Sequence, residues 1–445
     1  MKKASDSPRW HDRSAMVWIL FGMLALQQPM CHGLKHKMEG PADMMSKFNF
    51  SSAVPGQLGA SLLENPHSNT WPAFVRESAK RLGIHLGNSL FLQRHARTTS
   101  ALEQVLPMID AKASNLTEKV WKRGECATVV KGLVNTSVQV QDAMQLVHTG
   151  LFLKSWNKPP MVKLAVRKLR LVMLSFLATQ DLKRMQLHVW LDVDVTDPNG
   201  IIQQELKEIL VKPSLSESVV LHRFDAGKEF SRISPNSAVL LTGIFDQDGA
   251  VQAKSDLQRV ILLYNYGGIW LDTDVILIQN LMPLVGFDWA YLGQENLINN
   301  AALSVSAPQS VFATSYLMAL VSQYVTPELQ DTSYFKHGPV ILSQLHNHEW
   351  TRNSFHVLPT CFFDGHWSGE EDSPAWPTFF SDDIDEKQLS YIMPRNNRRT
   401  AFAYHWHGNW GIPISNRSLA YGLERIYSWM LTLNTTESVD MVDTP

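Results

Sequence analysis

The spacing of hydrophobic and polar residues divides the chain into stretches of different texture. From about residue 35 to 149 the sequence is polar and irregular, with helical periodicity near 97–112 and 137–148. From about residue 150, apolar stretches of helical period alternate with β-rich runs, as an α/β domain requires. We therefore predict a stem and helical adaptor over 35–149, an α/β domain over 150–430 and a tail over 431–445.

Within the α/β domain, helices and strands are expected to alternate. Apolar residues three and four positions apart predict helices at 161–179, 203–210 and 254–264, and short apolar runs predict strands at 187–195, 218–224 and 269–278. The helix at 254–264 is followed by Gly267 and Gly268, a typical helix stop, and the next strand begins at once.

One segment near the N-terminus has the character of a membrane span. The uncharged run 14–34 follows basic residues, but its apolar centre covers only 15–26, so the span is marginal. The basic residues ahead of it favour a signal anchor, with a cleaved signal peptide as the alternative. This predicts a cytoplasmic tail over 1–13 and a single-pass type II protein of the Golgi or endoplasmic reticulum membrane with its main domain in the lumen, secreted if the segment is cleaved.

Export would place the cysteines in an oxidising compartment. Of the three cysteines, Cys126 and Cys361 are candidates for one bridge, and the sequence leaves open whether they pair. Cys31 would lie at the membrane or be removed. Sequons for N-glycosylation, which agree with export, occur at Asn49, Asn115, Asn135, Asn416 and Asn434.

Composition and charge exclude several classes of protein. With 44% hydrophobic and 18% charged residues, the 445-residue chain is neither disordered nor a membrane protein of many spans. Lys and Arg total 40 against 42 Asp and Glu, so no basic excess is present to hold nucleic acid. The cysteine spacings give no CxxC pair of the zinc or redox type.

The candidate chemistry lies directly after the double glycine. Asp272 and Asp274 are one residue apart in an otherwise apolar run, and alternation along an extended strand would aim both carboxylates to the same side. Two like charges at this range are costly unless a cation neutralises them, and oxygen ligands select Mg²⁺ or Mn²⁺. The pair therefore predicts a divalent metal site. The alternative, without a binding role, is a strand end with two solvated aspartates.

The run 254–281, KSDLQRVILLYNYGGIWLDTDVILIQNL, resembles the signature of DXD glycosyltransferases of the sugar-binding-region type. These include fungal α-1,6-mannosyltransferases and α-1,4-galactosyl- and N-acetylglucosaminyltransferases. Their pattern, S-D-x-x-R, an apolar helix, then G-G-[IV]-[YW]-x-D-x-D, occurs here without a gap. Weaker matches over about 150–412 include Asn299 to Ala301, His337 to Pro339, Leu358 to Phe362 and His405 to Trp410. In the last of these, Asn409 stands where Ser is usual.

The resemblance implies a GT-A fold, a mixed and mainly parallel sheet flanked by helices, with the DXD motif at the C-terminal end of a central strand. It also implies retaining, metal-dependent transfer of a hexose from a nucleotide sugar, with UDP-sugars favoured over GDP-mannose, to a glycan, glycolipid or protein. The implied ligands of Mn²⁺ or Mg²⁺ are Asp272 and Asp274. The implied donor-binding residues are Asp256, Arg259, Gly267, Gly268, Asp272, Asn300, Asn409 and Trp410. No residue stands out as a nucleophile, so no catalytic residue is assigned.

Two other functions stay open at this point. Asp192 and Asp194, in D-V-D-V-T after an apolar run, have the spacing of a haloacid-dehalogenase-like phosphatase that uses Mg²⁺. A non-catalytic, sugar-binding relative of the transferases is the second alternative. The sequence does not identify the sugar, the acceptor, the linkage or the oligomeric state.

Overall fold

The computed structural model describes 101–113, 123–135, 144–156, 158–197, 200–247, 250–293, 297–325, 337–348, 351–365, 379–382 and 401–436. All of these residues belong to one compact unit that spans 64–445. The predicted anchor at 14–34 and the first part of the predicted stem lie outside the described residues.

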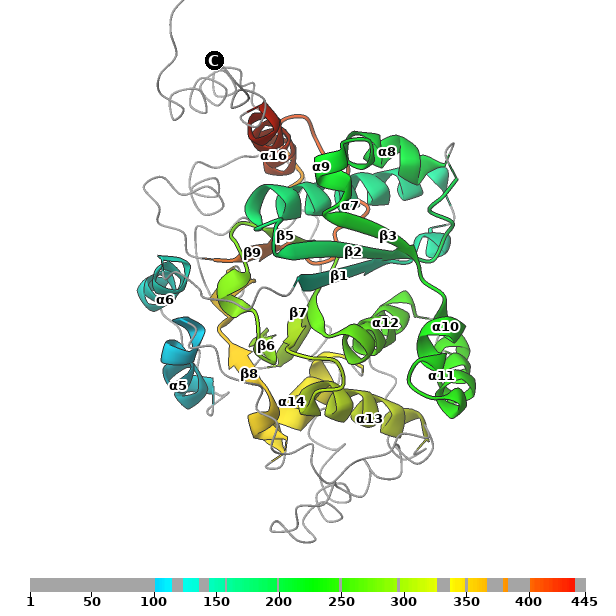
Figure 1. Cartoon of the computed structure of the whole chain (residues 1–445), viewed down its shortest axis with the longest axis vertical. Coiled ribbons are helices and arrows are strands. Elements are labelled where there is room, and N and C mark those ends of the chain that lie inside the picture. The colour runs from blue at the N-terminus through cyan, green and yellow to red at the C-terminus, as the bar shows by residue number, and fades with distance from the viewer. Residues whose placement is uncertain are drawn as a thin grey trace, which may run out of the picture. The chain divides into compact units, whose positions relative to one another are not determined.

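A seven-stranded sheet forms the centre of this unit, in the order β3-β2-β1-β4-β7-β6-β8 (Figure 1). Its strands are β1 (Gln145–Leu151), β2 (Met185–Leu191), β3 (Val219–Arg223), β4 (Gly268–Leu271), β6 (Trp289–Leu292), β7 (Ile298–Val305) and β8 (His356–Leu358). Of these strands only β7 runs antiparallel to its neighbours. The predicted mixed, mainly parallel sheet flanked by helices is confirmed.

The helices lie in two groups, one on each face of the sheet. Around the first face are α7 (Pro159–Thr179), α8 (Ile201–Leu210), α9 (Pro213–Ser216) and α16 (Leu419–Thr436); around the second are α10 (Ala226–Ser231), α11 (Pro235–Gln247), α12 (Val251–Tyr266), α13 (Val311–Val325) and α14 (Pro339–Asn347). Alternation along β4 separates the two cores: Ile269 and Leu271 pack in the α7 core, and Trp270 packs in the α12 core.

The predicted elements agree with the structure in most places. The helices expected at 161–179, 203–210 and 254–264 correspond to α7, α8 and α12. The helix expected near 97–112 corresponds to α5 (Ala101–Ala113). The helical periodicity near 137–148 was misleading, because β1 already begins at Gln145, inside this stretch and ahead of the expected boundary at 150. α16 extends beyond the expected start of the tail at 431.

The single strand expected at 269–278 is broken at the DXD motif. β4 ends at Leu271, and β5 (Val275–Leu277) leaves the main sheet to pair with β9 (Ala403–His405). A turn closes between them, in which the Val275 N–H donates to the Asp272 carbonyl at 3.0 Å. The assumption of an extended chain at the two aspartates is therefore wrong, because the chain turns there to join a second, two-stranded sheet.

The double glycine makes the entry to β4 possible. Gly267 and Gly268 have φ angles of 68° and 91°, which residues with a side chain rarely adopt. A Cβ atom at Gly268 would lie 2.3 Å from the carbonyl oxygen of Leu146 in β1, and one at Gly267 would lie 3.0 Å from Pro308. The space beside both glycines is thus filled by the protein itself.

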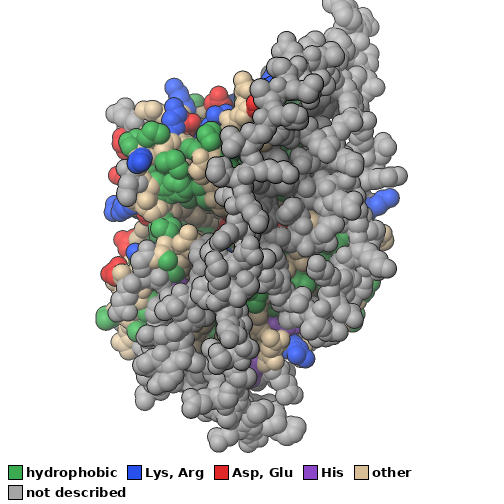
Figure 2. Space-filling view, turned by 180° about the vertical axis from the view of Figure 1, so that it is seen from behind, with side chains coloured by type: hydrophobic (Ala, Val, Ile, Leu, Met, Phe, Trp, Pro, Cys, Tyr) green, Lys and Arg blue, Asp and Glu red, His purple; other side chains and the backbone are tan. Residues whose placement is uncertain are grey.

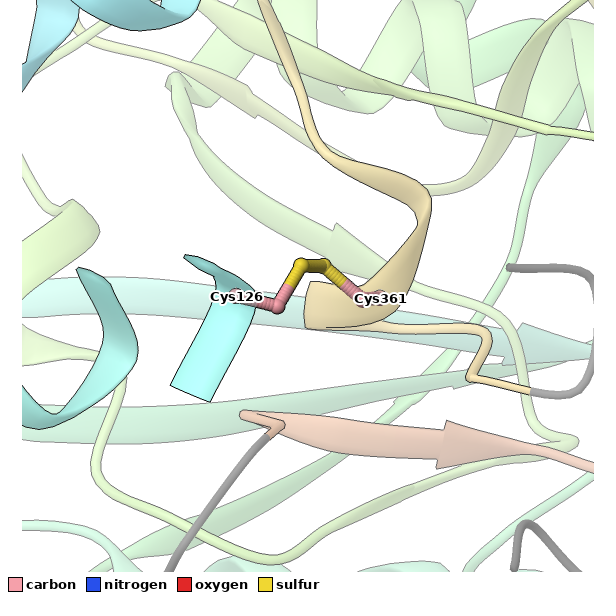
Figure 3. Close-up of a disulfide and its surroundings, with 2 residues drawn as sticks. All are labelled: Cys126 and Cys361. Atoms are coloured by element: carbon pink, nitrogen blue, oxygen red, sulfur yellow. A yellow bond between two sulfur atoms is a disulfide. The ribbon is translucent and has the colours of Figure 1, made fainter. Parts of the chain in front are cut away.

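A disulfide joins Cys126 in α6 (Arg123–Asn135) to Cys361 in the short 3-10 helix η6 (Thr360–Phe362), as Figure 3 shows. This settles the pairing that the sequence left open. The two residues are 235 positions apart, and both are buried. The bridge therefore ties α6 to the segment that leads into Asp364.

We expect reduction of this disulfide to lower the free energy of unfolding by about 2–4 kcal/mol, because the unfolded chain regains the freedom of a long loop. Urea unfolding of the wild type with and without reductant measures the difference. Cys31→Ala serves as the control and should respond to reductant as the wild type does. Equal unfolding midpoints in oxidised and reduced protein would contradict the expectation.

On the face seen in Figure 2, acidic and basic side chains mix along the left edge, around a group of hydrophobic side chains. This mixture agrees with the net charge of -2 and with the absence of a basic excess in the sequence.

The predicted localisation is corrected. In the part of the chain that the structure describes, no helix is long and apolar enough to cross a bilayer, so a single-pass type II protein of the Golgi or endoplasmic reticulum is unsupported. The segment 14–34, on which the prediction rested, lies outside the part of the chain to which this finding applies.

Candidate functional site

The candidate site is built around the turn between β4 and β5, which carries both aspartates of the DXD motif. β4 is the middle strand of the sheet, and the turn follows its C-terminal end, where open α/β sheets place ligands. The Asp272 N–H donates to the Ala301 carbonyl of β7 at 2.7 Å, which fixes the start of the turn. The Trp270 indole N–H donates to Asp272 Oδ1 at 2.6 Å.

On one side of the turn, Arg259 of α12 links the motif to two further predicted residues. Its guanidinium lies 2.8 Å from Asp272 Oδ1 and 3.2 Å from Asp256 Oδ1, and it donates to the Asn300 carbonyl. The Asn300 amide donates to Asp256 Oδ1 at 2.8 Å. Arg259, Asp256 and Asn300 are all buried, so a charged network below the surface holds the partly exposed Asp272.

This network sets the charge state of Asp272. Burial raises the pKa of Asp272, and the opposing charge of Arg259 only partly offsets this effect. About a quarter of the Asp272 side chain is still exposed, at 25%. Asp272 is thus a carboxylate that is partly open to a ligand and held in place from behind by Arg259.

On the other side of the turn, Asp274 is held by the segment that follows β9. Its Oδ2 accepts the Gly408 N–H at 2.6 Å, and its carbonyl accepts the Trp406 N–H at 3.0 Å. Its Oδ1 lies 3.4 Å from His405 Nε2. Burial alone would raise the pKa of Asp274, but the charge of His405 and the hydrogen bonds lower it, so the carboxylate is ionised.

Behind Asp274 lies a second carboxylate that binds two histidines. Asp364 Oδ2 is 3.3 Å from His405 Nδ1 and 2.7 Å from His407 Nε2. Asp364 is only 1% exposed. Burial opposes protonation of His405, but the two carboxylates outweigh it and raise the pKa of His405 to about 10. His405 therefore bridges Asp274 and Asp364 as a cation.

Two overlapping groups of side chains have the chemistry to hold a divalent ion. Asp364, His405 and His407 offer ligand atoms that all lie within 4.8 Å of one another. Asp274 Oδ1 and His405 Nε2, 3.4 Å apart, also suit two ligands of one ion, whose bonds are each about 2.1 Å. A bound ion would displace the proton of His405, because only neutral imidazole binds a cation. Carboxylate ligands suit Mn²⁺ or Mg²⁺, and an imidazole ligand favours a transition-metal ion over Mg²⁺.

Four of the predicted donor-binding residues have contacts within the protein that give them another role. The space beside Gly267 and Gly268 is taken by β1 and by Pro308, so these glycines serve the packing of the strand. The Asn409 amide donates to the Trp406 carbonyl at 2.6 Å and thereby closes its own loop. Trp410 is half-buried, and its ring packs against Trp406, at 6.0 Å between ring centroids.

The sequence analysis did not assign three residues to the site that the structure places there. Asp364 follows the stretch that resembles L-P-x-x-x-F, but a lone aspartate there gave no signal. His405 belongs to a motif that the resemblance covered, although its contact with Asp274 arises only in the fold. Lys168, which donates to the Asn409 carbonyl, did leave a signal, because it is a charge on the apolar stripe of α7 with Ala165 and Val172.

The phosphatase alternative is not supported by the geometry of its two aspartates. Asp192 Oδ1 accepts the Leu153 N–H at 2.6 Å, so it fastens the loop after β1. Asp194 is exposed, and its Oδ1 accepts the N–H and hydroxyl of Thr196 at 2.9 and 2.7 Å in a local turn. Both carboxylates stabilise loops and neither belongs to the network around the DXD turn.

Part of the chain, around the DXD turn, is similar to a family of glycosyltransferases. Residues 208–291 match the family described as glycosyltransferase sugar-binding region containing DXD motif, which confirms the resemblance seen in the sequence. This match supports glycosyl transfer as the function. None of the curated proteins matches the chain.

Among solved structures, three glycosyltransferases illustrate the similarity. The PaToxG glycosyltransferase is 13% identical, with 57% of this chain and 82% of that chain covered and a TM-score of 0.34. Mouse xyloside xylosyltransferase 1, in its apo form, is 14% identical, with 61% and 99% covered and a TM-score of 0.34. The galactosyltransferase LgtC, in complex with donor and acceptor sugar analogs, is 11% identical, with 67% and 97% covered and a TM-score of 0.32.

Proposed function

We propose that this protein is a metal-dependent hexosyltransferase that moves a sugar from a nucleotide-sugar donor to a glycan, glycolipid or protein acceptor, with retention of anomeric configuration. The observation that carries the proposal is the fixed orientation of Asp274, whose Oδ2 is bound by the Gly408 N–H and whose Oδ1 faces His405. UDP-sugars are the preferred donors in this proposal, on the strength of the family resemblance.

Asp274, His405 and Asp272 would hold the ion. Mn²⁺ or Mg²⁺ supplies positive charge that stabilises the departing nucleoside diphosphate. Asp364 orients the imidazole of His405 from behind, since metal-binding histidines usually direct their other ring nitrogen to a carboxylate. This arrangement leaves Asp364 outside the direct ligands, in agreement with its nearly complete burial.

The Arg259 network would position the donor. Arg259 fixes Asp272 through the 2.8 Å contact, so that this carboxylate keeps one orientation when a ribose hydroxyl or a metal-bound water approaches. Asp256 and Asn300, bonded to each other, provide carboxylate and amide groups on the side where the resemblance implies the donor-sugar hydroxyls. No nucleophile is assigned, so the retention mechanism is proposed only as same-face departure and attack.

A donor panel tests this function. Purified protein is supplied with UDP-galactose, UDP-glucose, UDP-N-acetylglucosamine or GDP-mannose and Mn²⁺, and release of the nucleoside diphosphate is measured. We expect release of nucleoside diphosphate from at least one donor. This release should be lost in excess chelator, since the ion stabilises the charge that develops on the leaving group by several kcal/mol.

Two other outcomes would contradict the proposal. Metal-dependent hydrolysis of a phosphomonoester without release from any nucleotide sugar would favour the phosphatase reading. Sugar binding with neither reaction would indicate a non-catalytic relative.

A further inference from the structure

Lys168 is a fully buried cation in the middle of α7. Its exposed fraction is 0%, and it lies on the apolar stripe that packs against the sheet. Its ammonium donates to the Asn409 carbonyl and lies 3.7 Å from the centre of the Phe380 ring. Among the residues that the structure describes, no carboxylate lies within ion-pair distance of it.

A lysine in this position is unfavourable for folding. Burying an ammonium group without a carboxylate partner costs free energy, and an apolar side chain of similar size often packs there at lower cost. Burial accordingly lowers the pKa of Lys168 to about 7, while the charge of Asp274 acts in the opposite direction. The fold alone therefore gives no reason for a positive charge here, and Asp274 is the acidic group near enough to act on it.

The backbone that Lys168 holds is the segment that orients Asp274. His407 and Gly408 have φ angles of 51° and 67°, and for His407 this left-handed conformation is strained. The Gly408 N–H then points at Asp274 Oδ2, at 2.6 Å. The Asn409 carbonyl, which accepts a hydrogen bond from Lys168, follows Gly408 directly in the chain. The lysine therefore fixes the turn at His407 and Gly408.

We infer that Lys168 is a positioning residue of the transferase site, which holds the segment 406–410 against Asp274 and adds a positive charge to the subsite for a metal-bound nucleoside diphosphate. This inference rests on the proposed function. A diphosphate carries more negative charge than one divalent ion neutralises, and a buried cation at its subsite is worth more than one in water. Binding of the diphosphate thus accounts for the buried positive charge of Lys168, which does not stabilise the fold.

Lys168→Met tests the inference, because methionine fills the same space without the charge. Mn²⁺-dependent binding of UDP and of GDP is measured by calorimetry for the full chain, together with the melting temperature. For the nucleotide that the wild type binds more tightly, we expect a loss of about tenfold or more in affinity, as for a lost charged hydrogen bond. The melting temperature should be unchanged or higher. Lys163→Met, an exposed lysine of the same helix, is the control and should match the wild type.

Wild-type nucleotide affinity in folded Lys168→Met would overturn the inference, as would a lower melting temperature without a change in affinity. If Lys168→Met does not fold, Lys168→Gln replaces it, with the same criteria. Asp274→Asn separates this test from that of the proposed function. If Asp274→Asn retains Mn²⁺-dependent nucleotide binding, the proposed function fails. If Asp274→Asn loses binding and Lys168→Met does not, only the inference about Lys168 fails.

Discussion

Asp274→Asn is expected to reduce Mn²⁺-dependent release of nucleoside diphosphate by on the order of 10²-fold or more. The reason is that a metal ion stabilises the charge that develops on the leaving group by several kcal/mol. Asparagine keeps the size of the side chain but removes its charge. The Gly408 N–H that now binds Oδ2 at 2.6 Å would still find a partner of the same shape. The loss should therefore arise from the missing anionic ligand, and initial rates against Mn²⁺ concentration measure it.

Asp194→Asn is the matched control for this experiment. Asp194 is exposed in a local turn with Thr196 and lies outside the proposed site, so its rate should equal that of the wild type. A rate near the wild-type value in Asp274→Asn would rule out the metal assignment. Loss of activity in Asp194→Asn alone would revive the phosphatase reading.

Arg259→Met is expected to lower the free energy of unfolding by about 3–5 kcal/mol, since it leaves buried carboxylates without their cation. Arg259 is 3% exposed and contacts Asp272 at 2.8 Å and Asp256 at 3.2 Å. Methionine restores neither the charge nor the hydrogen bond to Asn300. Urea unfolding at neutral pH, where both carboxylates need this partner, measures the effect.

Arg184→Met provides the comparison for a salt bridge at the surface. Arg184 pairs with Asp181 at 2.7 Å, but both side chains are about a third exposed, at 35% and 28%. Exposed pairs contribute only about 0–1 kcal/mol, so this change should be small. If the two variants lose the same stability, the buried network does not have the role assigned to it.

Local patterns predicted the helices and strands between about 161 and 278 because they depend on neighbours in the sequence. The apolar spacing over 161–179 and the double glycine after 254–264 gave α7 and the end of α12 to within a few residues. At the end of the stretch 137–148, in residues 145–148, the helix prediction failed because the pairing of β1 with β2 and β4 outweighed the helical periodicity. Tertiary pairing of this kind overrides a weak local preference.

The candidate site could be predicted only in part for the same reason. The resemblance implied that Asp256, Arg259, Asp272 and Asn300 lie at one site, and the structure brings these four side chains together. The predicted role of Asn409 rested on a side chain that instead bonds its own loop at Trp406. Whether a polar side chain faces a ligand or its own backbone depends on the turn it occupies.

The sequence by itself determined the alternation of helices and strands over about 161–271, the position of the two aspartates after a glycine stop, and the likeness to a family of sugar transferases. Only the tertiary structure decided that the chain turns between these aspartates, and that His405, Asp364 and Lys168 meet Asp274 and its loop. The reason is physical: contacts between residues 41 to 241 positions apart depend on how strands pair and helices pack, and no local pattern records them.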